Sequence, residues 1–445
     1  MALKGLDIFK ITPKTNCKQC GNPTCMAFAM KVASGAVPLE KCPFITDDVK
    51  EQLSEATAPP MKTIKVNENT LGGETVLERH EKTFVSKTLY AMKVCNADTD
   101  ENNAATFENI AKVDYERIGE RMFVEFLLVN YVEGKGEDRY FDLVKKAVDT
   151  GRDLILSCAN PDVAKAAIAL VGGKKVILDG ANADNYEAMN AVAKAAGAVL
   201  GVRGKDLNEL HDTVEKLEKL GNKELILNVG TESAKEAFKN TVEIRRAAIK
   251  GGDRTFGYPT IVNVSRLAIG DGYMQAALTT LFTAKYGSIV VLDNMDYAKA
   301  LPIYGLRQNL FTNPQKPMKV EPGIYPINGA DENSICLTTV DFALTYFVVS
   351  GEIERSGVPA NLLISDAGGY SVLTAWAAGK LSASSLKKFI DEYQIEDKIK
   401  NRTLVLPGKV AVLKGEVQEK LPGWNIVIAP TEAIELVKFL KDQQQ

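Results

Sequence analysis

The stretch DLILSCANPDVAKAAIALVGGKKVILD, from Asp153 to Asp179, shows the repeating unit from which most of this 445-residue chain is built. Its first and last five residues are short apolar runs, which predict buried β-strands. The segment 161–171 between them predicts a helix, because Asn160 is a favoured helix cap and Pro161 suits the first helical position. A strand, a helix and a second strand in this order predict two parallel strands covered by the helix.

The same alternation extends from residue 84 to residue 312. The apolar runs lie at 86–93, 122–129, 153–157, 175–179, 198–202, 224–228, 260–264 and 288–292. Helical patterns follow them at 138–149, 161–171, 184–196, 206–219, 231–249 and 272–286. Continuous apolar runs joined by helices indicate parallel strands covered on both sides. Eight such units in about 230 residues match the size of a (β/α)8 TIM barrel. A doubly wound open sheet is the alternative, because periodicity does not reveal whether a sheet closes.

Four of the seven cysteines lie near the start of the chain, at Cys17, Cys20, Cys25 and Cys42. Three thiolates on one short loop and a fourth from beyond a helix can hold a 4Fe–4S cluster. A structural zinc site also takes four cysteines, but usually as two separated pairs, which this spacing fits poorly. A disulfide framework requires an oxidising compartment and a small secreted chain, and the sequence indicates neither. The cluster is the preferred interpretation, followed by zinc and then by disulfides.

The residues around these cysteines favour the cluster. Pro23 and Gly35 suit the start and the end of a helix over 23–34, which places Cys25 in its first turn. The free N–H groups and the positive end of such a helix favour an anionic cluster. A further helix is expected around 46–56, before the prolines of TAPP at 57–60. We therefore assign residues 1–57 to an iron–sulfur domain and residues 58–83 to a linker or short hairpin.

The composition is ordinary for a globular protein, with 45% hydrophobic and 25% charged residues. The formal net charge of −3 gives no basis for binding nucleic acid, and no run of about 18 apolar residues predicts a membrane span. The N-terminus lacks a signal-peptide core, so we expect a cytoplasmic protein with no nucleic-acid or membrane partner. Cys95, Cys158 and Cys336 are expected to be buried thiols. The two histidines, His80 and His211, lie among charged neighbours and are expected at the surface.

The last third of the chain has its own pattern. Four prolines and two glycines between residues 313 and 331 predict a semi-rigid linker. Beyond it, strands are expected at 334–340, 361–365, 403–406 and 425–429, and helices at 341–354, 370–379, 383–393, 410–420 and 431–441. This pattern predicts a small doubly wound domain over residues 332–445, separate from the barrel over 84–312.

Three strand ends of this last domain are expected at one edge of its sheet. They are the segments 338–340, 366–371 and 430–433. Ligands of open α/β sheets bind at that edge, and small hydroxylated or apolar residues there suit a large, mostly apolar ligand. Gly368 and Gly369 would let the backbone approach a flat or anionic ligand, but an ordinary tight strand-to-helix turn explains them equally well.

The predicted barrel strands end in polar residues, Asn96, Asn130, Asn160, Asp179, Asn228, Asn263 and Asp293. A polar ring at this face of a barrel could bind a pterin-like ring. Helix capping explains Asn and Asp at these positions more simply. The chain has no His-Glu-x-x-His zinc motif, no Gly-x-Ser-x-Gly motif and no Walker loop, so no residue is assigned as catalytic.

Over its whole length the chain resembles the large (gamma) subunit of the corrinoid iron–sulfur proteins. The cysteine pattern, the predicted barrel and the segment SDAGGYSVLT at 365–374 carry this resemblance. It implies a 4Fe–4S domain, a TIM barrel and a C-terminal, Rossmann-like, corrinoid-binding domain. The implied function is to accept a methyl group from a methyl-pterin (methyltetrahydrofolate-type) donor on Co(I) and to deliver it for acetyl-CoA synthesis, while the cluster re-reduces occasional Co(II).

The resemblance also implies contacts and partners. The implied corrinoid contacts are Thr338, Thr339, Val340, Tyr346, Gly369, Tyr370, Ser371, Val372, Leu373, Thr374, Pro430, Thr431 and Ala433. Thr374 is the candidate beneath the corrin ring, and a threonine packed in the core is the alternative. The implied partners are a small barrel subunit in a heterodimer, a methyl-pterin:corrinoid methyltransferase, acetyl-CoA synthase/CO dehydrogenase and a low-potential electron donor.

Many corrinoid proteins place a histidine beneath cobalt, but no histidine follows His211 in this chain. A base-off corrinoid without a protein histidine ligand is therefore expected, and the absence of an axial nitrogen makes Co(I) easier to reach. The alternative is that His80 or His211 reaches the metal from another domain. Two other functions stay open at this stage. One is an iron–sulfur barrel enzyme acting on a pterin or a small acid, and the other is an electron-transfer scaffold.

Overall fold

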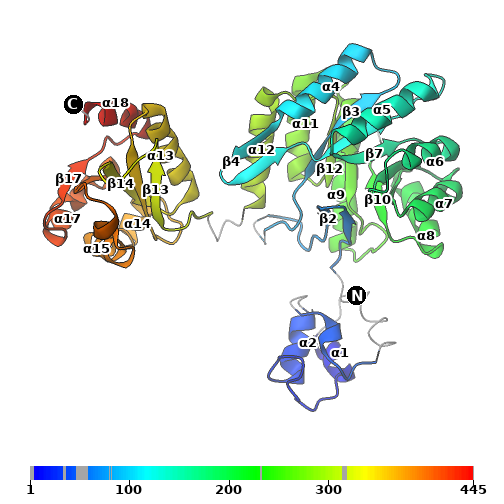
Figure 1. The fold of residues 1–445 in the computed structure, drawn as a ribbon. Helices are drawn as coiled ribbons and strands as arrows, with labels where there is room; N and C mark the ends of the chain where they lie inside the picture. The colour runs from blue at the N-terminus through cyan, green and yellow to red at the C-terminus, as the bar shows by residue number, and fades with distance from the viewer. Residues whose placement is uncertain are drawn as a thin grey trace. The chain divides into compact units, whose positions relative to one another are not determined.

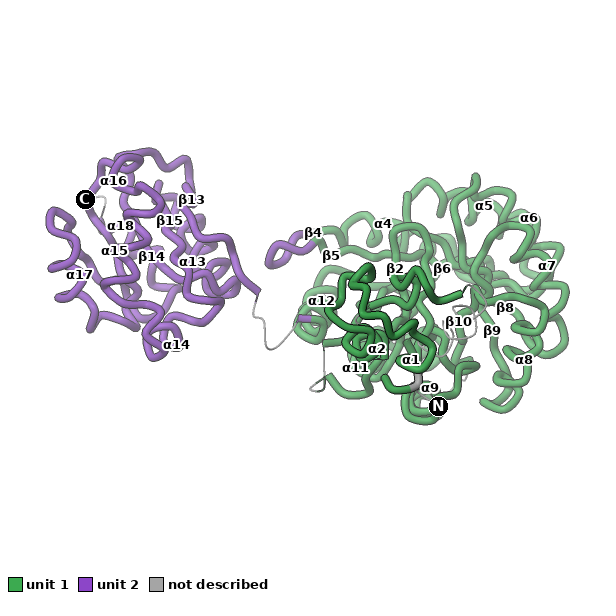
Figure 2. Tube along the Cα trace, turned by 90° about the horizontal axis from the view of Figure 1, so that it is seen from below, with its two compact units in different colours: residues 1–115, 121–311 green, residues 116–120, 312–445 purple. Residues whose placement is uncertain are grey.

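The computed structural model describes residues 5–33, 37–46, 59–79, 81, 83–230, 233–312 and 318–443. The helix expected around 46–56, His80 and the first prolines of the predicted linker lie outside these residues. The chain forms two compact units, residues 1–115 with 121–311 and residues 116–120 with 312–445 (Figure 2).

The cysteine-rich segment contains three short helices, α1 (Gly5–Ile11), α2 (Cys25–Ala33) and the 3-10 helix η1 (Leu39–Lys41). Ile8, Phe28 and Leu39 from these helices share a small core. The helix predicted over 23–34 begins at Cys25, two residues later than expected. The reason is that Thr24 caps it, since its Oγ1 accepts the backbone N–H of Ala27 at 3.0 Å.

Eight parallel strands form a closed barrel in the order β10-β11-β12-β3-β6-β7-β8-β9 (Figure 1). The strands are β3 (Leu89–Cys95), β6 (Phe126–Asn130), β7 (Asp153–Ser157), β8 (Ile177–Ala181), β9 (Val199–Val202), β10 (Leu225–Asn228), β11 (Thr260–Asn263) and β12 (Ile289–Leu292). The pairing of β12 with β3, in which Ile289 lies opposite Leu89, closes the sheet. The predicted TIM barrel is therefore confirmed, and the open-sheet alternative is wrong for this part of the chain.

A ring of helices covers the barrel. They are α4 (Asp100–Lys112), α5 (Glu137–Asp149), α6 (Pro161–Ala169), α7 (Tyr186–Ala196), α8 (Leu207–Lys219), α9 (Ala234–Ile249), α10 (Val264–Leu267), α11 (Gly272–Ala284) and α12 (Tyr297–Phe311). Each long helix buries an apolar stripe, as α8 does with Leu210, Val214 and Leu217. No helix of the described residues is long and apolar enough to cross a membrane.

Two hairpins accompany the barrel. One consists of β1 (Thr63–Val66) and β2 (Asn69–Gly72), and the other of β4 (Asp114–Arg117) and β5 (Glu120–Phe123). The second one corrects the single strand predicted over 122–129, which is divided between β5 and β6. The division falls at buried Glu125, which accepts the backbone N–H of Tyr90 at 2.9 Å and pairs with Arg307 at 2.7 Å. This interior ion pair lies where the barrel strand β6 begins.

The second unit contains a five-stranded sheet in the order β13-β15-β14-β16-β17. The strands are β13 (Gly323–Ile327), β14 (Ile335–Val340), β15 (Ala360–Ser365), β16 (Thr403–Leu406) and β17 (Asn425–Ile428). All are parallel except β13, which runs antiparallel to β15 at the edge. β15, the next strand in the chain, lies on one side of β14, and β16 lies on the other side. The strand order therefore reverses between β14 and β16, the place where open α/β sheets bind ligands.

Helices pack on both faces of this sheet. The helical segments are α13 (Ala343–Ser356), α14 (Val372–Ala377), α15 (Ala383–Glu392), α16 (Ile395–Lys398), η2 (Gly408–Leu413), α17 (Lys414–Lys420), η3 (Ala433–Glu435) and α18 (Leu436–Asp442). Residues of α14, α15 and α17 belong to one apolar core, and residues of α13 and α18 belong to the other. The sheet is thus buried from both sides.

The predicted linker over 313–331 needs a correction in its second half. Residues 323–327 form β13, and Lys319 forms an isolated antiparallel bridge with Phe342. Proline hid this strand from the sequence pattern, and Pro326 is tolerated because β13 is an edge strand. The domain boundaries themselves remain proposals.

Candidate functional site

The four N-terminal cysteines are free thiols that differ in exposure. Cys17 is exposed, Cys20 is half-buried, and Cys25 and Cys42 are buried. Cys25 is the first residue of α2, while Cys20 and Cys42 pack with the small core of α1 and α2. Three of the four cysteines are therefore held by the same small folded segment, and Cys17 lies on the loop that leads to it.

Two asparagines that the sequence analysis missed organise this loop. The Oδ1 of Asn16 accepts the backbone N–H of Cys25 at 2.8 Å. The Nδ2 of Asn22 donates to the Cys20 carbonyl oxygen at 3.1 Å and lies 3.8 Å from its Sγ. Asn16 and Gly21 have φ values of 49° and 74°, a left-handed conformation that asparagine and glycine tolerate. Hydrogen bonds to ligand sulfurs tune iron–sulfur clusters, so this loop fits a cluster.

No three His, Cys, Asp or Glu side chains of the described residues surround a single metal position. A zinc site would require its ligands to lie around one ion. A 4Fe–4S cluster places each cysteine on a different iron, so its four sulfurs stand farther apart. The choice between the cluster and zinc therefore continues to rest on the spacing of the cysteines.

A cavity of about 410 Å³ opens in the second unit at the reversal point of the sheet. It is lined by the ends of β14, β16 and β17, together with residues of α13 and the start of α14. Eight of the predicted contacts line it, namely Thr338, Thr339, Ser371, Val372, Leu373, Pro430, Thr431 and Ala433. The structure thus brings together residues from all three predicted strand ends.

The other five predicted contacts do not line this cavity. Val340 is fully buried in the core, and Tyr346 packs against Tyr325 with 5.1 Å between ring centroids. The Tyr370 ring lies 4.7 Å from Lys380 Nζ. Thr374 is exposed, so its alternative interpretation as a core threonine is wrong.

The last of these five is Gly369, whose backbone N–H already forms hydrogen bonds within the protein. That group donates to both carboxylate oxygens of buried Asp341, at 2.9 and 3.0 Å. Asp341 also accepts the N–H of Ala367 at 3.0 Å. The glycine turn therefore serves first to wrap around Asp341, and its contact with a ligand stays a prediction.

Sequence reasoning missed two walls of the cavity. One is the end of β16, with Val405, Leu406, Pro407 and Gly408, and the other is a face of α13 with Leu344, Thr345 and Val348. The first wall follows from the rule that ligands bind at the carboxyl ends of the strands, because β16 ends there as well. A Cβ on Gly408 would lie 2.4 Å from the carbonyl oxygen of Ala429, so glycine allows this close approach. No sequence signal marks the α13 face.

Two buried hydroxyls in this cavity have no partner. Within the described chain, Thr338 Oγ1 and Thr339 Oγ1 make no hydrogen bond. Leaving such a group unsatisfied typically costs about 1–3 kcal/mol. At the mouth, Leu344, Val348 and Leu373 are each nearly half exposed. Buried hydroxyls without a partner and exposed apolar side chains at the mouth would both fit a large ligand that is mostly apolar and carries some polar groups.

The polar ring of the barrel divides into two groups. Asn130, Asp179, Asn228 and Asn263 line a smaller cavity of about 90 Å³ at the carboxyl ends of the strands. Asn160 caps α6 as predicted, by accepting the N–H groups of Asp162 and Val163. Asn96 bonds to the backbone of Val132, and Asp293 bonds to Gln275 and Lys93. Capping therefore explains Asn160 but not the cavity residues.

The remaining cysteines and the described histidine can also be placed. Cys95, Cys158 and Cys336 are buried free thiols, as predicted. Burial raises the pKa of Cys158 to about 11. His211 was expected at the surface. It is half-buried, because it lies 3.3 Å from Asp253 and packs edge-on against Phe256.

Comparison with known protein families decides the relationship. The family described as "CO dehydrogenase/acetyl-CoA synthase delta subunit" matches residues 63–440. The chain belongs to this family. Residues 13–44, which contain all four N-terminal cysteines, match the family described as "Putative Fe-S cluster".

Two full-length relatives support the assignment. The "Corrinoid/iron-sulfur protein large subunit" of Moorella thermoacetica is 37% identical and covers 99% of both chains. The "Acetyl-CoA decarbonylase/synthase complex subunit gamma" of Methanopyrus kandleri is 33% identical over 99% of this chain and 98% of its own. The resemblance stated from the sequence is therefore confirmed. Among solved structures, Thermus thermophilus dihydropteroate synthase covers 56% of this chain and 97% of its own at 14% identity, with a TM-score of 0.39, too weak a likeness for any inference.

Proposed function

We propose that this chain carries methyl groups in the acetyl-CoA pathway, with a corrinoid in the cavity of the second unit and a 4Fe–4S cluster on Cys17, Cys20, Cys25 and Cys42. The name of the Moorella thermoacetica relative supports both cofactors. The observation that carries the proposal is the cavity of about 410 Å³ at the reversal point of the sheet, whose lining includes two threonines with buried hydroxyls that have no partner.

The cavity fits one side of a corrinoid. A corrin macrocycle has broad apolar faces and a rim of amide groups. Leu344, Val348 and Leu373 at the mouth would pack against the ring, and Thr338 and Thr339 would offer hydroxyls to polar groups that enter. We accordingly propose that the second unit is a doubly wound, corrinoid-binding domain that begins near residue 318, because β13 belongs to its sheet.

A bound corrinoid would supply a strongly nucleophilic Co(I) centre that displaces a methyl group from its donor. The chain contributes orientation and the absence of an axial ligand. The second unit contains no histidine, and His211 lies 3.3 Å from Asp253 within the barrel unit. The second unit therefore offers the metal no histidine nitrogen, which would ease its reduction. The role of the cluster cysteines is to hold a redox centre that returns oxidised cobalt to the active state.

The proposed partners follow from this role. The methyl group would come from a methyl-pterin through a methyltransferase and would leave to acetyl-CoA synthase/CO dehydrogenase. A small barrel subunit would complete a heterodimer, and a low-potential donor would reduce the cluster. Support comes from the gamma-subunit relative, whose name places it in an acetyl-CoA decarbonylase/synthase complex.

Methyl iodide tests the carrier role without any partner protein. The corrinoid-loaded full chain is reduced with Ti(III) citrate, freed of excess reductant and given methyl iodide. Displacement forms a cobalt–carbon bond and releases iodide. Thiols of the chain also react with methyl iodide, so the expected result is about one iodide per cobalt in excess of the corrinoid-free protein. Protein prepared without corrinoid is the control. Equal iodide release by the two preparations would contradict the proposal. A preparation that has lost only its iron would still release the additional iodide, because the chemical reductant reduces the cobalt directly.

A further inference from the structure

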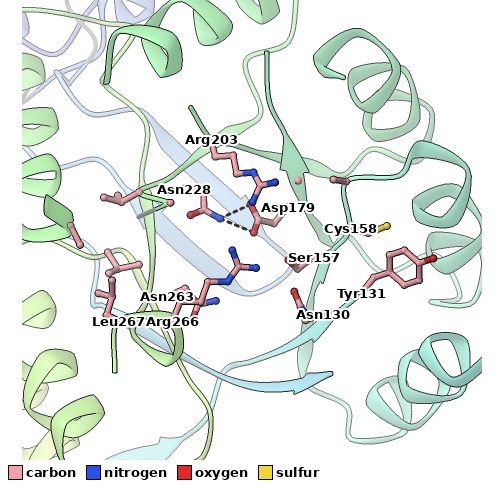
Figure 3. A pocket seen from close by; sticks show the side chains of 16 residues that line it. Asn130, Tyr131, Ser157, Cys158, Asp179, Arg203, Asn228, Asn263, Arg266 and Leu267 are labelled. Carbon is pink, nitrogen blue, oxygen red and sulfur yellow. Dashed lines mark hydrogen bonds between the residues drawn. The ribbon is translucent and has the colours of Figure 1, made fainter. Parts of the chain in front are cut away.

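The mouth of the barrel contains a second built cavity, which the carrier role does not use. It lies where β6, β7, β8, β10 and β11 end, and its volume is about 90 Å³. At about 30 Å³ for each water molecule, it has room for a few waters or one small polar group. Its charged lining residues are Asp179, Arg203 and Arg266 (Figure 3).

The two arginines carry charge that the protein does not neutralise by direct pairing. Arg203 follows β9 and is half-buried, and Arg266 lies in α10 and is exposed. Among the described residues neither guanidinium has a hydrogen bond or a close ion pair, and the charged group on which both act is Asp179, whose pKa they lower. Both extend toward the space beside Asp179 in Figure 3. Guanidinium groups bind carboxylates and phosphates with paired N–H donors.

The Asp179 carboxyl group is held in this mouth by its surroundings. The Nδ2 of Asn228 donates to its two oxygens at 2.9 and 2.8 Å. A β-bulge between Asp179 and Ala181 interrupts the strand there, and bulges commonly re-aim a side chain at a site. Gly201 on the neighbouring strand makes room, because a Cβ there would lie 2.6 Å from Asp179 Oδ1.

The bulge also depends on a glycine. A Cβ on Gly180 would lie 2.2 Å from the carbonyl oxygen of Cys158, a contact that no side chain tolerates. Gly180 and Gly201 thus both serve the placement of one carboxyl group. A carboxylate has about four acceptor positions, of which Asn228 uses two, so Asp179 can still accept a hydrogen from a ligand.

We propose that this cavity binds a small acid: an oxyanion group, carboxylate or phosphate, that also carries its own hydrogen-bond donor. Arg203 and Arg266 hold the oxyanion, and Asp179 accepts the ligand's O–H or N–H. Two positive groups face one carboxyl group, so the cavity selects an anion over a neutral or cationic ligand. The donor requirement separates hydroxy acids or hydrogen phosphate from simple carboxylates.

Isothermal titration calorimetry on the full chain tests this with three probes: inorganic phosphate, glycolate and acetate. Glycolate carries a hydroxyl beside its carboxylate and acetate does not. We expect phosphate or glycolate to bind at one site, and acetate to bind more weakly than glycolate. Which of the first two binds more tightly identifies the source of the oxyanion.

Arg203→Gln and Arg266→Gln are each expected to weaken binding at least about tenfold, because each removes a charged hydrogen-bond donor. Arg246→Gln is the matched control, since Arg246 is an exposed arginine of α9 that lies outside the cavity. Circular dichroism should show that all three variants are folded, so that weaker binding reports on the cavity and not on unfolding. Absence of binding by both phosphate and glycolate, or equal affinities in the wild type and both cavity variants, would overturn the proposal.

Discussion

The backbone N–H of Gly369 donates to the buried carboxylate of Asp341, at 2.9 Å from Oδ1 and 3.0 Å from Oδ2. Asp341 follows β14 and Gly369 follows β15, so this contact joins two adjacent strand ends beside the cavity. It also explains the glycine pair, because Gly368 and Gly369 have φ values of 74° and 76°, which other residues adopt only with strain.

Replacing Asp341 with Ala is expected to destabilise the second unit. The N–H groups of Ala367 and Gly369 would lose their acceptor, at about 1–3 kcal/mol for each buried group. Both tryptophans, Trp376 and Trp424, lie in this unit, so tryptophan fluorescence during urea unfolding reports on it alone. Asp366→Asn is the control, because that carboxylate is largely exposed. An Asp341→Ala midpoint equal to that of the wild type would show that the turn does not depend on this carboxylate.

Thr338→Val and Thr339→Val are expected to act in opposite directions on stability and on cofactor binding. Each removes a buried hydroxyl without a partner, so the corrinoid-free chain should gain stability, by up to about 1–3 kcal/mol. If these hydroxyls bind the corrinoid, retention of the cofactor should fall. Urea unfolding without corrinoid and cobalt retention after gel filtration measure the two effects. Greater stability with unchanged retention would remove these threonines from the proposed site.

Cys42→Ala is expected to lose the cluster and to leave the barrel folded. Cys42 packs in the small N-terminal core, which is separate from the core of the barrel. Iron content and circular dichroism of anaerobically purified protein measure both effects. Cys336→Ala is the matched control, because Cys336 is an equally buried thiol of the second unit. A full iron content in Cys42→Ala would show that another residue binds the cluster.

Asp179→Asn is expected to stabilise the barrel increasingly as pH rises. Burial raises the pKa of Asp179 above its ordinary value of 3.8, although Asn228 and the two arginines oppose this shift. Between the ordinary and the raised pKa the folded state binds more protons, so wild-type stability falls as pH rises through that window. Asparagine does not ionise and escapes this loss.

Urea unfolding followed by circular dichroism between pH 4 and pH 8 measures the difference in stability between Asp179→Asn and the wild type. This difference should grow between the ordinary and the raised pKa of Asp179 and then become constant above the raised pKa. Asp184→Asn, at an exposed position near α7, should show no such trend. A difference that shrinks with rising pH would mean that Asp179 is stabilised in its charged form.

How far the sequence predicts this molecule depends on the kind of signal. The barrel could be predicted because its strands are continuous apolar runs, such as 153–157, and its caps are local, as at Asn160. The strand β13 could not be predicted, because proline and glycine occur both in linkers and in edge strands. Only its pairing with β15 shows that residues 323–327 form a strand.

The candidate sites show the same limit. The strand-end rule located eight lining residues of the large cavity, since that rule needs only strand order. It could not show that the Gly369 N–H is taken by Asp341, a contact between residues 28 positions apart. Nor could it separate Asn160, a cap, from Asp179, a residue of the barrel cavity, because both follow strands and differ only through a bulge and distant neighbours.

Electron paramagnetic resonance of the Co(II) state tests the central claim most directly. The full chain, loaded with corrinoid and oxidised to Co(II), should show a base-off cobalt signal without nitrogen superhyperfine splitting. The signal should be identical in His211→Ala, because His211 is paired with Asp253 in the barrel. Absence of a protein-bound cobalt signal would contradict the carrier account, and nitrogen splitting that disappears in His80→Ala or His211→Ala would contradict its account of the metal.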